Sequence, residues 1–381
     1  MPVLTCGGMR YQHSWDDVDP GGIPAAAQAN LEATVRRALE VGMHHIETAR
    51  GYGTSEVQLG RILPGLPRER IIVQTKVEPT ADPAQFLAGC ERSLRNLGLD
   101  HVDLLALHGI NSPELLEWSL RDGGCLEAAE ALRRQGRARH LGFSTHAPPE
   151  LILRAVESGR FDYVNLHWYW VNPFTWPAVE AAAARDMGVL VISPNDKGGK
   201  LYEPPPKLVE LCAPLHPMQF NLLYCLGRPE VHTLSIGAAR PGDYDCHLAA
   251  LDRYPEAAAA SAPVAARLEA EMVRVLGADW CANWWRGIPD ERLLPGRVNV
   301  HEILRLWSLA TALDMVGFAR MRYNLLGNAD HWAPGRNAAA FDEAALRAAL
   351  CDNPFADRIP GILREAHALL STAPARRLSE S

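Results

Sequence analysis

Ionisable residues stand at the ends of three short apolar runs in the first third of the chain. Glu47 ends "HHIE", Lys76 ends "IIVQTK" and His108 ends "VDLLALH", while Tyr52 follows Glu47 by five residues, between two glycines. Tyrosine is a weak acid in water, but a lysine cation beside it favours the phenolate and lowers the pKa of the phenol. A carboxylate keeps such a lysine charged, and a histidine can orient a carbonyl oxygen. The four residues therefore suit proton delivery to a polarised carbonyl group.

Each of these residues also has a simpler interpretation. A single lysine or histidine at the end of a strand is often a loop residue or an ordinary hydrogen-bonding group. Glu47 alone could pair with Arg50 or cap a helix beginning near Ser55. The catalytic interpretation is favoured because consecutive strands of a barrel bring their carboxyl ends to one mouth, where chemistry takes place in such folds.

The elements that would position these residues follow one another regularly. Apolar runs predict strands near 71–75, 101–107, 138–144, 162–167, 188–193 and 232–237. Helical patterns predict helices in "ANLEATVRRALEVGM" and near 82–98, 125–135, 147–158, 175–187 and 241–252. With the opening "PVLTCGG" and "HHIE", roughly eight strand–helix units fill the first ~250 residues, which is typical of a (β/α)8 TIM barrel. A doubly wound open sheet is the alternative, but no G-x-G-x-x-G follows the first strand.

A change in composition near residue 253 divides the chain. We predict a barrel over 1–252, an Ala-rich linker or helix over 253–275, and a mostly helical C-terminal extension over 276–381.

Composition restricts the class of protein. Of the 381 residues, 48% are hydrophobic and the net charge is −7, without a basic run that would indicate nucleic acid. No apolar stretch has membrane-spanning length, and no secretory signal opens the chain, so we expect no membrane partner. Eight scattered cysteines without a C-x-x-C pair indicate reduced thiols in a cytoplasmic protein. Nothing in the sequence decides between a monomer and a homo-oligomer.

Several motifs together resemble those of the aldo-keto reductase superfamily. "HIETARGYGTSEVQLGRIL" resembles the first signature of that family, "IIVQTKV" its lysine strand, and "SLRNLGLDHVDLLALHG" its second signature. "RHLGFSTHAP", "GVLVISPNDKGGKL" and "LSIGAARPGDYDCHL" are similar to its fifth, seventh and eighth strands. The resemblance implies an NADPH- or NADH-dependent reductase of a small aldehyde or ketone, or the reverse oxidation of an alcohol or sugar. It implies that Tyr52 is the general acid, Lys76 and Glu47 its support, and His108 the residue that orients the carbonyl.

The same resemblance implies a cofactor site. Ser144 and Asn165 match positions that hold the nicotinamide carboxamide. Trp168 either stacks near the nicotinamide ring or packs a loop within the aromatic run "HWYW". Gly237 and Arg240 match positions that bind the cofactor phosphates. An arginine suits a 2′-phosphate, which favours NADPH over NADH, although Arg240 could also be a solvated loop residue.

One departure from the family pattern concerns the acidic residue. The family has aspartate where this chain has Glu47, whose carboxylate reaches one methylene further. A displacement of about 1 Å in a catalytic site can cost on the order of 100-fold in rate. The site could therefore be adapted, slow or altered in its substrate.

The C-terminal region resembles a branch of the family that carries ferredoxin-like iron–sulfur clusters. Each such cluster needs four cysteine thiolates, but Cys281 and Cys351 each stand alone here. Trp284, Gly287 and Asn353 occupy positions where further ligands are expected. We therefore predict a degenerate extension without an iron–sulfur cluster and without a metal.

Other functions remain as alternatives. Glu47 and the missing cluster ligands also suit a catalytically weak nucleotide-binding sensor or a scaffold protein. An electron-transfer protein would need the missing cysteines. A zinc site formed by Cys281, Cys351, His301 and His331 has no support in their spacing.

Overall fold

The computed structural model describes residues 1–373, so the last eight residues of the predicted extension, 374–381, lie outside the described part. The chain forms two compact units. Unit 1 contains Met1–Gly198 and Asn221–Ala258, and unit 2 contains Gly199–Phe220 and the chain from Ala259 onward.

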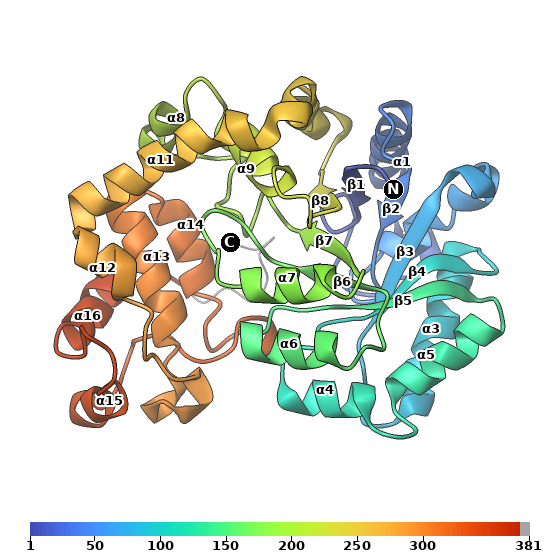
Figure 1. Cartoon of the computed structure of the whole chain (residues 1–381). Coiled ribbons are helices and arrows are strands. Elements are labelled where there is room, and N and C mark those ends of the chain that lie inside the picture. Colours follow the sequence, from blue (N-terminus) through green and yellow to red (C-terminus); the bar gives the residue numbers. More distant parts are fainter. Residues whose placement is uncertain (374–381) are drawn as a thin grey trace. The chain divides into compact units, whose positions relative to one another are not determined.

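Unit 1 is a closed barrel of eight parallel strands, with the strand order following the sequence (Figure 1). The strands are β1 (Leu4–Gly7), β2 (His45–Glu47), β3 (Ile72–Val77), β4 (Val102–Leu107), β5 (Ala138–Ser144), β6 (Tyr163–Leu166), β7 (Gly188–Ile192) and β8 (Thr233–Gly237). The barrel closes because β8 pairs with β1, with Leu4 opposite Leu234 and Gly7 opposite Gly237. The predicted (β/α)8 fold is therefore confirmed, and the open doubly wound sheet is wrong.

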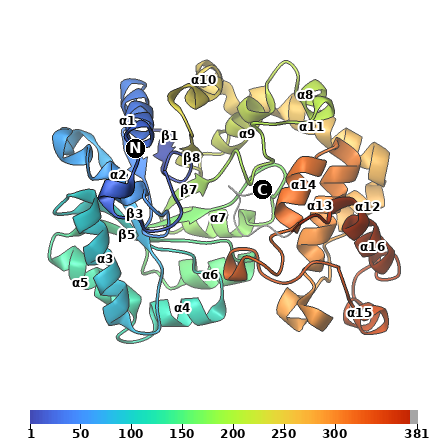
Figure 2. The same ribbon diagram turned by 180° about the vertical axis from the view of Figure 1, so that it is seen from behind.

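Helices cover the outside of this barrel (Figure 2). They are α1 (Ala25–Glu40), α2 (Ser55–Leu59), α3 (Pro83–Leu97), α4 (Pro113–Leu120), α5 (Cys125–Arg134), α6 (Pro149–Glu157), α7 (Trp176–Ala183) and α10 (Asp245–Leu248). Local signals account for α3, since the side chain of Asp82 accepts a hydrogen bond from the Ala84 amide at 3.0 Å and Pro83 lies in the first turn. Gly98 ends α3 in the left-handed conformation, with φ 64°.

One expected helix was wrong, and two helices were not predicted. The helix expected over 241–252 is broken into the 3-10 turn η4 (Pro241–Tyr244), the short α10 and the start of a second 3-10 turn, η5 (Leu251–Glu256). The connection between β7 and β8 contains two unpredicted helices, α8 (Pro206–Cys212) and α9 (Pro217–Leu226). Prolines and short apolar runs in these stretches hid their helical period.

Side chains fill the interior of the barrel. Leu104, Ala106, Tyr163 and Leu190 form one buried cluster. The ring of Tyr163 lies against Gly142, where an added Cβ would be only 2.5 Å from the ring. The interior of the barrel is thus a packed core. A site for a reaction is expected at the carboxyl ends of the strands.

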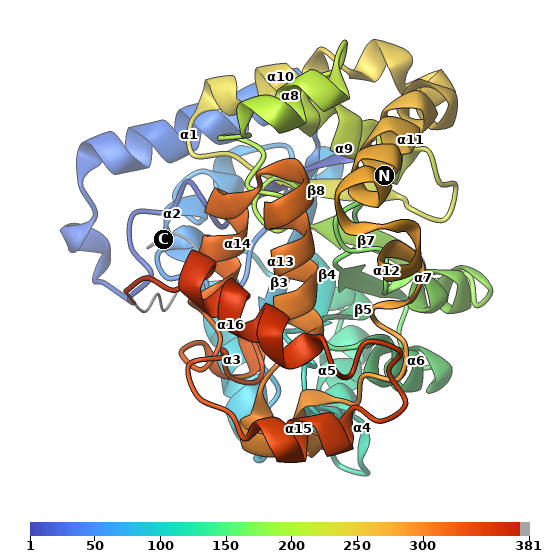
Figure 3. The same ribbon diagram turned by 90° about the vertical axis from the view of Figure 1, so that its left-hand side faces the viewer.

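Unit 2 is helical in its described part. Its main helices are α8, α11 (Ala257–Leu276, whose first residues belong to unit 1), α12 (Ala278–Asn283), α13 (Val300–Leu313), α14 (Val316–Tyr323), α15 (Glu343–Ala349) and α16 (Ile359–Leu370). Helix α16 crosses α13 and α14 and packs on both of them (Figure 3). The stretch predicted as an Ala-rich linker or helix lies in η5 and α11.

No helix within residues 1–373 is long and apolar enough to cross a membrane. All eight cysteines lie in this part of the chain, and each is a free thiol.

Candidate active site

A buried ion pair lies at the carboxyl end of β2 and β3. The ammonium group of Lys76 contacts the Glu47 carboxylate directly, and both side chains are almost fully buried, at 0% and 4% exposed. Lys76 Nζ also donates to the carbonyl of Thr48 at 2.9 Å. The alternative pairing of Glu47 with Arg50 does not occur, because Arg50 instead pairs with Asp17 and Glu56.

The second carboxylate oxygen of Glu47 is held from the opposite side. Ser235 Oγ on β8 donates to Glu47 Oε2 at 2.6 Å, although β1 lies between β8 and β2. The contact passes over Gly7 of β1, where an added Cβ would lie 2.7 Å from Ser235 Oγ. The missing side chain at Gly7 therefore lets a residue two strands away fix the carboxylate.

Tyr52 lies next to this pair. Its hydroxyl is 3.4 Å from Lys76 Nζ, and the same amine is 4.8 Å from the centroid of the phenol ring. The His108 ring meets the Tyr52 ring edge to face, with centroids 5.6 Å apart. Glu47, Lys76, Tyr52 and His108 thus lie together around one point of the barrel mouth, although two strands, β2 and β3, and the loops after β2 and β4 supply them.

The pKa shifts differ from the sequence expectation. Burial raises the pKa of Tyr52 above its ordinary value, and burial lowers the pKa of Lys76 well below its ordinary value. The expectation that the lysine cation lowers the net pKa of Tyr52 is therefore wrong for this state of the protein. The phenol keeps its proton at neutral pH, as a proton donor must.

The indole ring of Trp15, in the loop after β1, lies beside Tyr52. The Trp15 ring lies edge to face against Tyr52, with centroids 6.2 Å apart. The Thr54 amide donates to the carbonyl of Ser14 at 2.9 Å, and Thr54 Oγ1 accepts from the amide of Ser14 at 3.1 Å. Gly53, with φ 50°, is required here because an added Cβ would lie 1.9 Å from the Ser14 oxygen. The turn that carries Tyr52 therefore also fixes Trp15.

The residues expected to hold a carboxamide lie on adjacent strands. Ser144 of β5 and Asn165 of β6 are paired in register, and both are buried. Gln74 Nε2 donates to Asn165 Oδ1 at 2.7 Å, whereas Asn165 Nδ2 is buried without a hydrogen-bond partner among the described residues. A buried amide donor without an acceptor is costly, so this position suits a ligand that brings a carbonyl oxygen.

Trp168 lies in an aromatic cluster. Its ring is stacked on Tyr224 with centroids 5.1 Å apart and lies 4.7 Å from the Trp176 centroid. Only 2% of Trp168 is exposed, which favours the packing interpretation over stacking on a cofactor ring.

The two residues expected at the cofactor phosphates differ in their surroundings. Gly237 ends β8, and the aliphatic part of Arg10 covers it, with Cδ 3.2 Å from the place of an added Cβ. The Arg240 side chain is 79% exposed and pairs with Asp243 at 3.1 Å. Arg240 is therefore a solvated cation beside η4, available to a ligand but not aimed at one.

Sequence reasoning missed several of these residues. Ser235 lies two positions before Gly237, and strand alternation would place both on one face. Trp15 carries no signal, because its position depends on contacts of an irregular loop. His146 and His167 also follow strand ends, so the rule that selected His108 would have selected them too.

Comparison with known proteins identifies the chain. The fold is a closed eight-stranded barrel with a lysine, a tyrosine and a carboxylate at its mouth, which is one class of enzyme scaffold. Residues 3–198 match the model of the aldo/keto reductase family. The chain belongs to this family. It is 36% identical over 127 residues to an aldo-keto reductase of Mycolicibacterium paratuberculosis (strain ATCC BAA-968 / K-10), and 38% identical over 128 residues to one of Mycobacterium ulcerans (strain Agy99). Each alignment covers 32% of this chain and 43% of the relative, so the chain matches less than half of those relatives' length.

Solved structures share the fold. The holo form of an aldo-keto reductase from Bacillus halodurans has a TM-score of 0.57 at 21% identity, covering 70% of this chain and 91% of that one. An aldo/keto reductase from Klebsiella pneumoniae in complex with NADP and acetate has a TM-score of 0.53 at 21% identity, covering 66% and 86%.

Proposed function

We propose that this protein is an NADPH-dependent reductase of a small aldehyde or ketone, in which Tyr52 donates the proton. The observation that carries the proposal is the contact of Tyr52 with the buried Lys76–Glu47 pair at the barrel mouth. A bound nicotinamide cofactor supplies the hydride in this chemistry.

Each residue has a separate part in proton delivery. Tyr52 keeps its proton at neutral pH and can place it on a carbonyl oxygen. Lys76 Nζ, near the phenol oxygen, stabilises the phenolate that forms as the proton leaves. Glu47 holds Lys76 in place, and His108, beside the phenol, can donate a hydrogen bond that orients the carbonyl.

The surroundings fit a nicotinamide. The free donor of Asn165, beside Ser144, suits a carboxamide oxygen, and these two residues would hold that group. Arg240 is an exposed cation at a position that the motif resemblance assigns to the cofactor phosphates, and an arginine there would favour NADPH over NADH. The solved NADP complex of the Klebsiella relative supports the same choice.

The C-terminal extension is proposed to be a ferredoxin-like unit that has lost its clusters. Asn353 Nδ2 donates to the carbonyl oxygens of Trp284 and Arg286 at 2.8 and 2.7 Å. Gly287, with φ 65°, lies so close to Asp352 that an added Cβ would be 2.6 Å from its carbonyl oxygen. Amide hydrogen bonds and close backbone packing thus join two segments that cluster ligands would otherwise join.

Isotope transfer tests the proposed reaction. NADPH with deuterium in both positions at the nicotinamide C4 is incubated with the full chain and a panel of small aldehydes and ketones, and the alcohols are analysed by mass spectrometry. We expect one deuterium on carbon in each product alcohol. The matched reaction with ordinary NADPH in deuterated water should leave the carbinol carbon unlabelled. NADP+ with alcohols and sugars tests the reverse direction.

A catalytically weak sensor or scaffold is the second candidate, favoured by the raised pKa of Tyr52, which makes the phenol a weaker acid. NADPH binding with no turnover in either direction would favour this candidate and contradict the reductase.

A further inference from the structure

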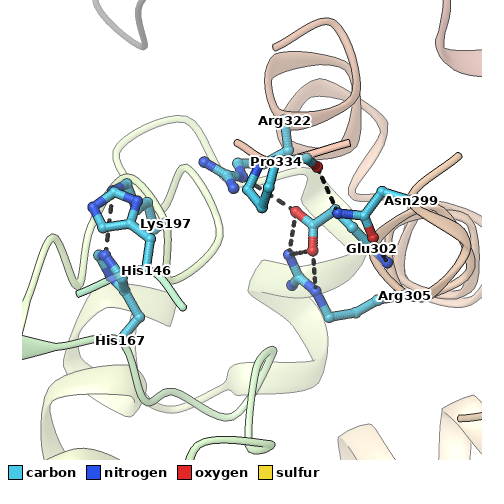
Figure 4. A network of polar contacts seen from close by, with 8 residues as sticks. All are labelled: His146, His167, Lys197, Asn299, Glu302, Arg305, Arg322 and Pro334. Atoms are coloured by element: carbon cyan, nitrogen blue, oxygen red, sulfur yellow. Dashed lines mark hydrogen bonds and ion pairs between the residues drawn. The ribbon is translucent and has the colours of Figure 1, made fainter. Parts of the chain in front are cut away.

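A second group of basic side chains lies in unit 1, and the mechanism above does not use it. The amine of Lys197 lies 3.2 Å from Nε2 of His167, and 3.2 and 2.9 Å from Nδ1 and Nε2 of His146 (Figure 4). The two imidazole rings meet edge to face with centroids 4.4 Å apart. We call these three residues the basic cluster.

A chain of hydrogen bonds runs through the ring of His167. The hydroxyl of Tyr169 donates to the carbonyl of Ile192, so its oxygen can accept the Nδ1 proton of His167, 2.7 Å away. Nε2 of His167 then carries a lone pair, which accepts a hydrogen bond from Lys197. Lys197 therefore donates to Nε2 of His167, and its amine also lies within hydrogen-bond distance of the His146 ring.

Hydrogen bonds from neighbouring elements hold the loop that carries Lys197. Asn221 Nδ2 donates to the carbonyl of Pro194 at 3.0 Å, and Asn195 Nδ2 lies 3.0 Å from Nε2 of His247. Gly198 permits this turn, because an added Cβ would lie 2.0 Å from the Pro194 oxygen. A fixed loop pre-organises the ammonium and reduces the entropy cost of binding a ligand.

The cluster lies at the end of the barrel where chemistry is expected. His146 and His167 each follow by two residues the pair Ser144 and Asn165, which are in register on β5 and β6. Lys197 follows β7, the next strand of the closed barrel. All three residues therefore come from loops at the carboxyl ends of neighbouring strands, which in barrel enzymes form the substrate mouth.

We propose that the basic cluster binds a negatively charged oxygen group of the substrate, so that the carbonyl compound reduced here carries a carboxylate or a phosphate. This inference rests on the proposed reductase function. An ammonium group forms stronger hydrogen bonds with an anionic oxygen than with a neutral imidazole nitrogen, so an entering oxyanion gains a charge-assisted contact with Lys197. The neighbouring imidazoles can donate to the same anion once protonated.

Matched substrates test the proposal. We compare 4-carboxybenzaldehyde with its methyl ester, and glyceraldehyde 3-phosphate with glyceraldehyde, in wild type, Lys197→Met and Lys200→Met. Lys200 is the charge-matched control because its amine pairs with Glu203 at 2.8 Å. A hydrogen bond to a charged group is worth about 1.5–3 kcal/mol, so we expect Lys197→Met to lower kcat/KM for an anionic substrate by about 10- to 100-fold. The neutral partner and the Lys200→Met variant should change less than about threefold.

Further readouts separate this idea from a role in folding or in cofactor binding. Lys197→Arg keeps the charge and should retain most of the preference for the anion, and the thermal midpoint of each variant reports whether it folds. Fluorescence titration with NADPH should give the same Kd in wild type and Lys197→Met. Isothermal titration with benzoate and benzamide reports anion binding without turnover, and wild type should bind benzoate more tightly.

Each outcome decides the question. Equal losses for anionic and neutral substrates in a folded Lys197→Met variant would assign the cluster to structure alone. A weakened NADPH Kd would assign it to the phosphates of the cofactor. Wild type without preference for the anion in turnover and binding also overturns the proposal. Preference for benzoate, lost in Lys197→Met, in a protein that turns over no carbonyl would keep the anion site and contradict the reductase.

Discussion

Glu47 contacts Lys76 although its side chain is one methylene longer than the aspartate that the family pattern places there. Its position is fixed from two sides, by the ammonium group and by Ser235 Oγ at 2.6 Å. A glycine at position 7 leaves the room for this second contact. The longer carboxylate is thus accommodated by its neighbours, so the substitution does not by itself indicate a lost active site.

Substitutions of Lys76 and Glu47 are expected to have strongly coupled effects on the free energy of unfolding. Removing one partner of a buried ion pair leaves an uncompensated charge, which costs about 3–5 kcal/mol. Lys76→Met and Glu47→Gln should each lower the free energy of unfolding by about that amount, whereas the double variant should lose much less than their sum. Urea unfolding of the three variants and the wild type measures this. Additive losses would mean that the two side chains do not interact as the structure has them.

At this scale the sequence identified the residues whose position follows from strand ends. Tyr52, Lys76, Glu47 and His108 come together because parallel neighbouring strands end at one mouth. Trp15 was not predictable, because its place depends on loop contacts far from any repeating pattern. The predicted direction of the pKa shift of Tyr52 was also wrong, because burial depends on packing that a sequence does not reveal.

At the scale of elements, α13 and α14 share a partly buried ionic contact. Glu302 accepts hydrogen bonds from Arg305 Nε and Nη2 at 2.8–3.0 Å and from Arg322 Nε at 3.3 Å (Figure 4). Asn299 caps the start of α13 by accepting from the Glu302 amide at 3.0 Å. Burial alone would raise the pKa of Glu302, but the two guanidinium groups outweigh it and lower this pKa from 4.5 to about 2.

This shift predicts acid sensitivity of the helical unit. A carboxylate with a lowered pKa stabilises the folded state at pH values above its ordinary pKa. This stability is lost as pH falls from 4.5 towards 2. The shift corresponds to about 3 kcal/mol. Glu302→Gln should be less stable than wild type at neutral pH, and the difference should shrink over that acid range.

Denaturant unfolding at a series of pH values measures the effect. Glu365→Gln, an exposed change of equal charge in α16, is the control and should follow wild type throughout. A difference between Glu302→Gln and wild type that stays constant with pH would contradict the assignment.

The helices and strands with strong local sequence signals were predicted more accurately than the others. Alternating apolar runs and caps located β3 to β8 and α3 within a few residues. The helices α8 and α9 were missed because they interrupt the repeat between β7 and β8, and tertiary contacts rather than periodicity set their limits.

At the scale of the molecule, the two units are interleaved in sequence. Residues Gly199–Phe220 belong to unit 2 although they lie between two strands of the barrel in sequence. Within unit 2, Lys207 of α8 pairs with Glu271 of α11 at 2.6 Å, and Arg267 Nε donates to the carbonyl of Leu211 at 2.9 Å. Dividing the sequence at a single boundary does not show that residues Gly199–Phe220 belong to unit 2. The contacts that place them there are made with residues distant along the chain.

The whole chain is predicted to bind no iron–sulfur cluster and no zinc. No group of three or more metal-ligating side chains is present within residues 1–373, and Cys281 and Cys351 each stand alone in their motifs. Anaerobically purified protein should show only the absorption of an aromatic protein, and elemental analysis should find less than about 0.1 mole of iron or zinc per chain. A broad visible absorption with stoichiometric iron would contradict this account of the extension.

The most direct test of the central claim separates turnover from cofactor binding in Tyr52→Phe. General acid catalysis contributes about 100- to 10,000-fold, so kcat with NADPH and a carbonyl substrate should fall by that factor. The NADPH Kd from fluorescence titration should stay within about twofold of wild type, and Tyr254→Phe, at an exposed tyrosine, should change neither quantity. A Tyr52→Phe variant that keeps wild-type kcat would contradict the role of the phenol and the function built on it.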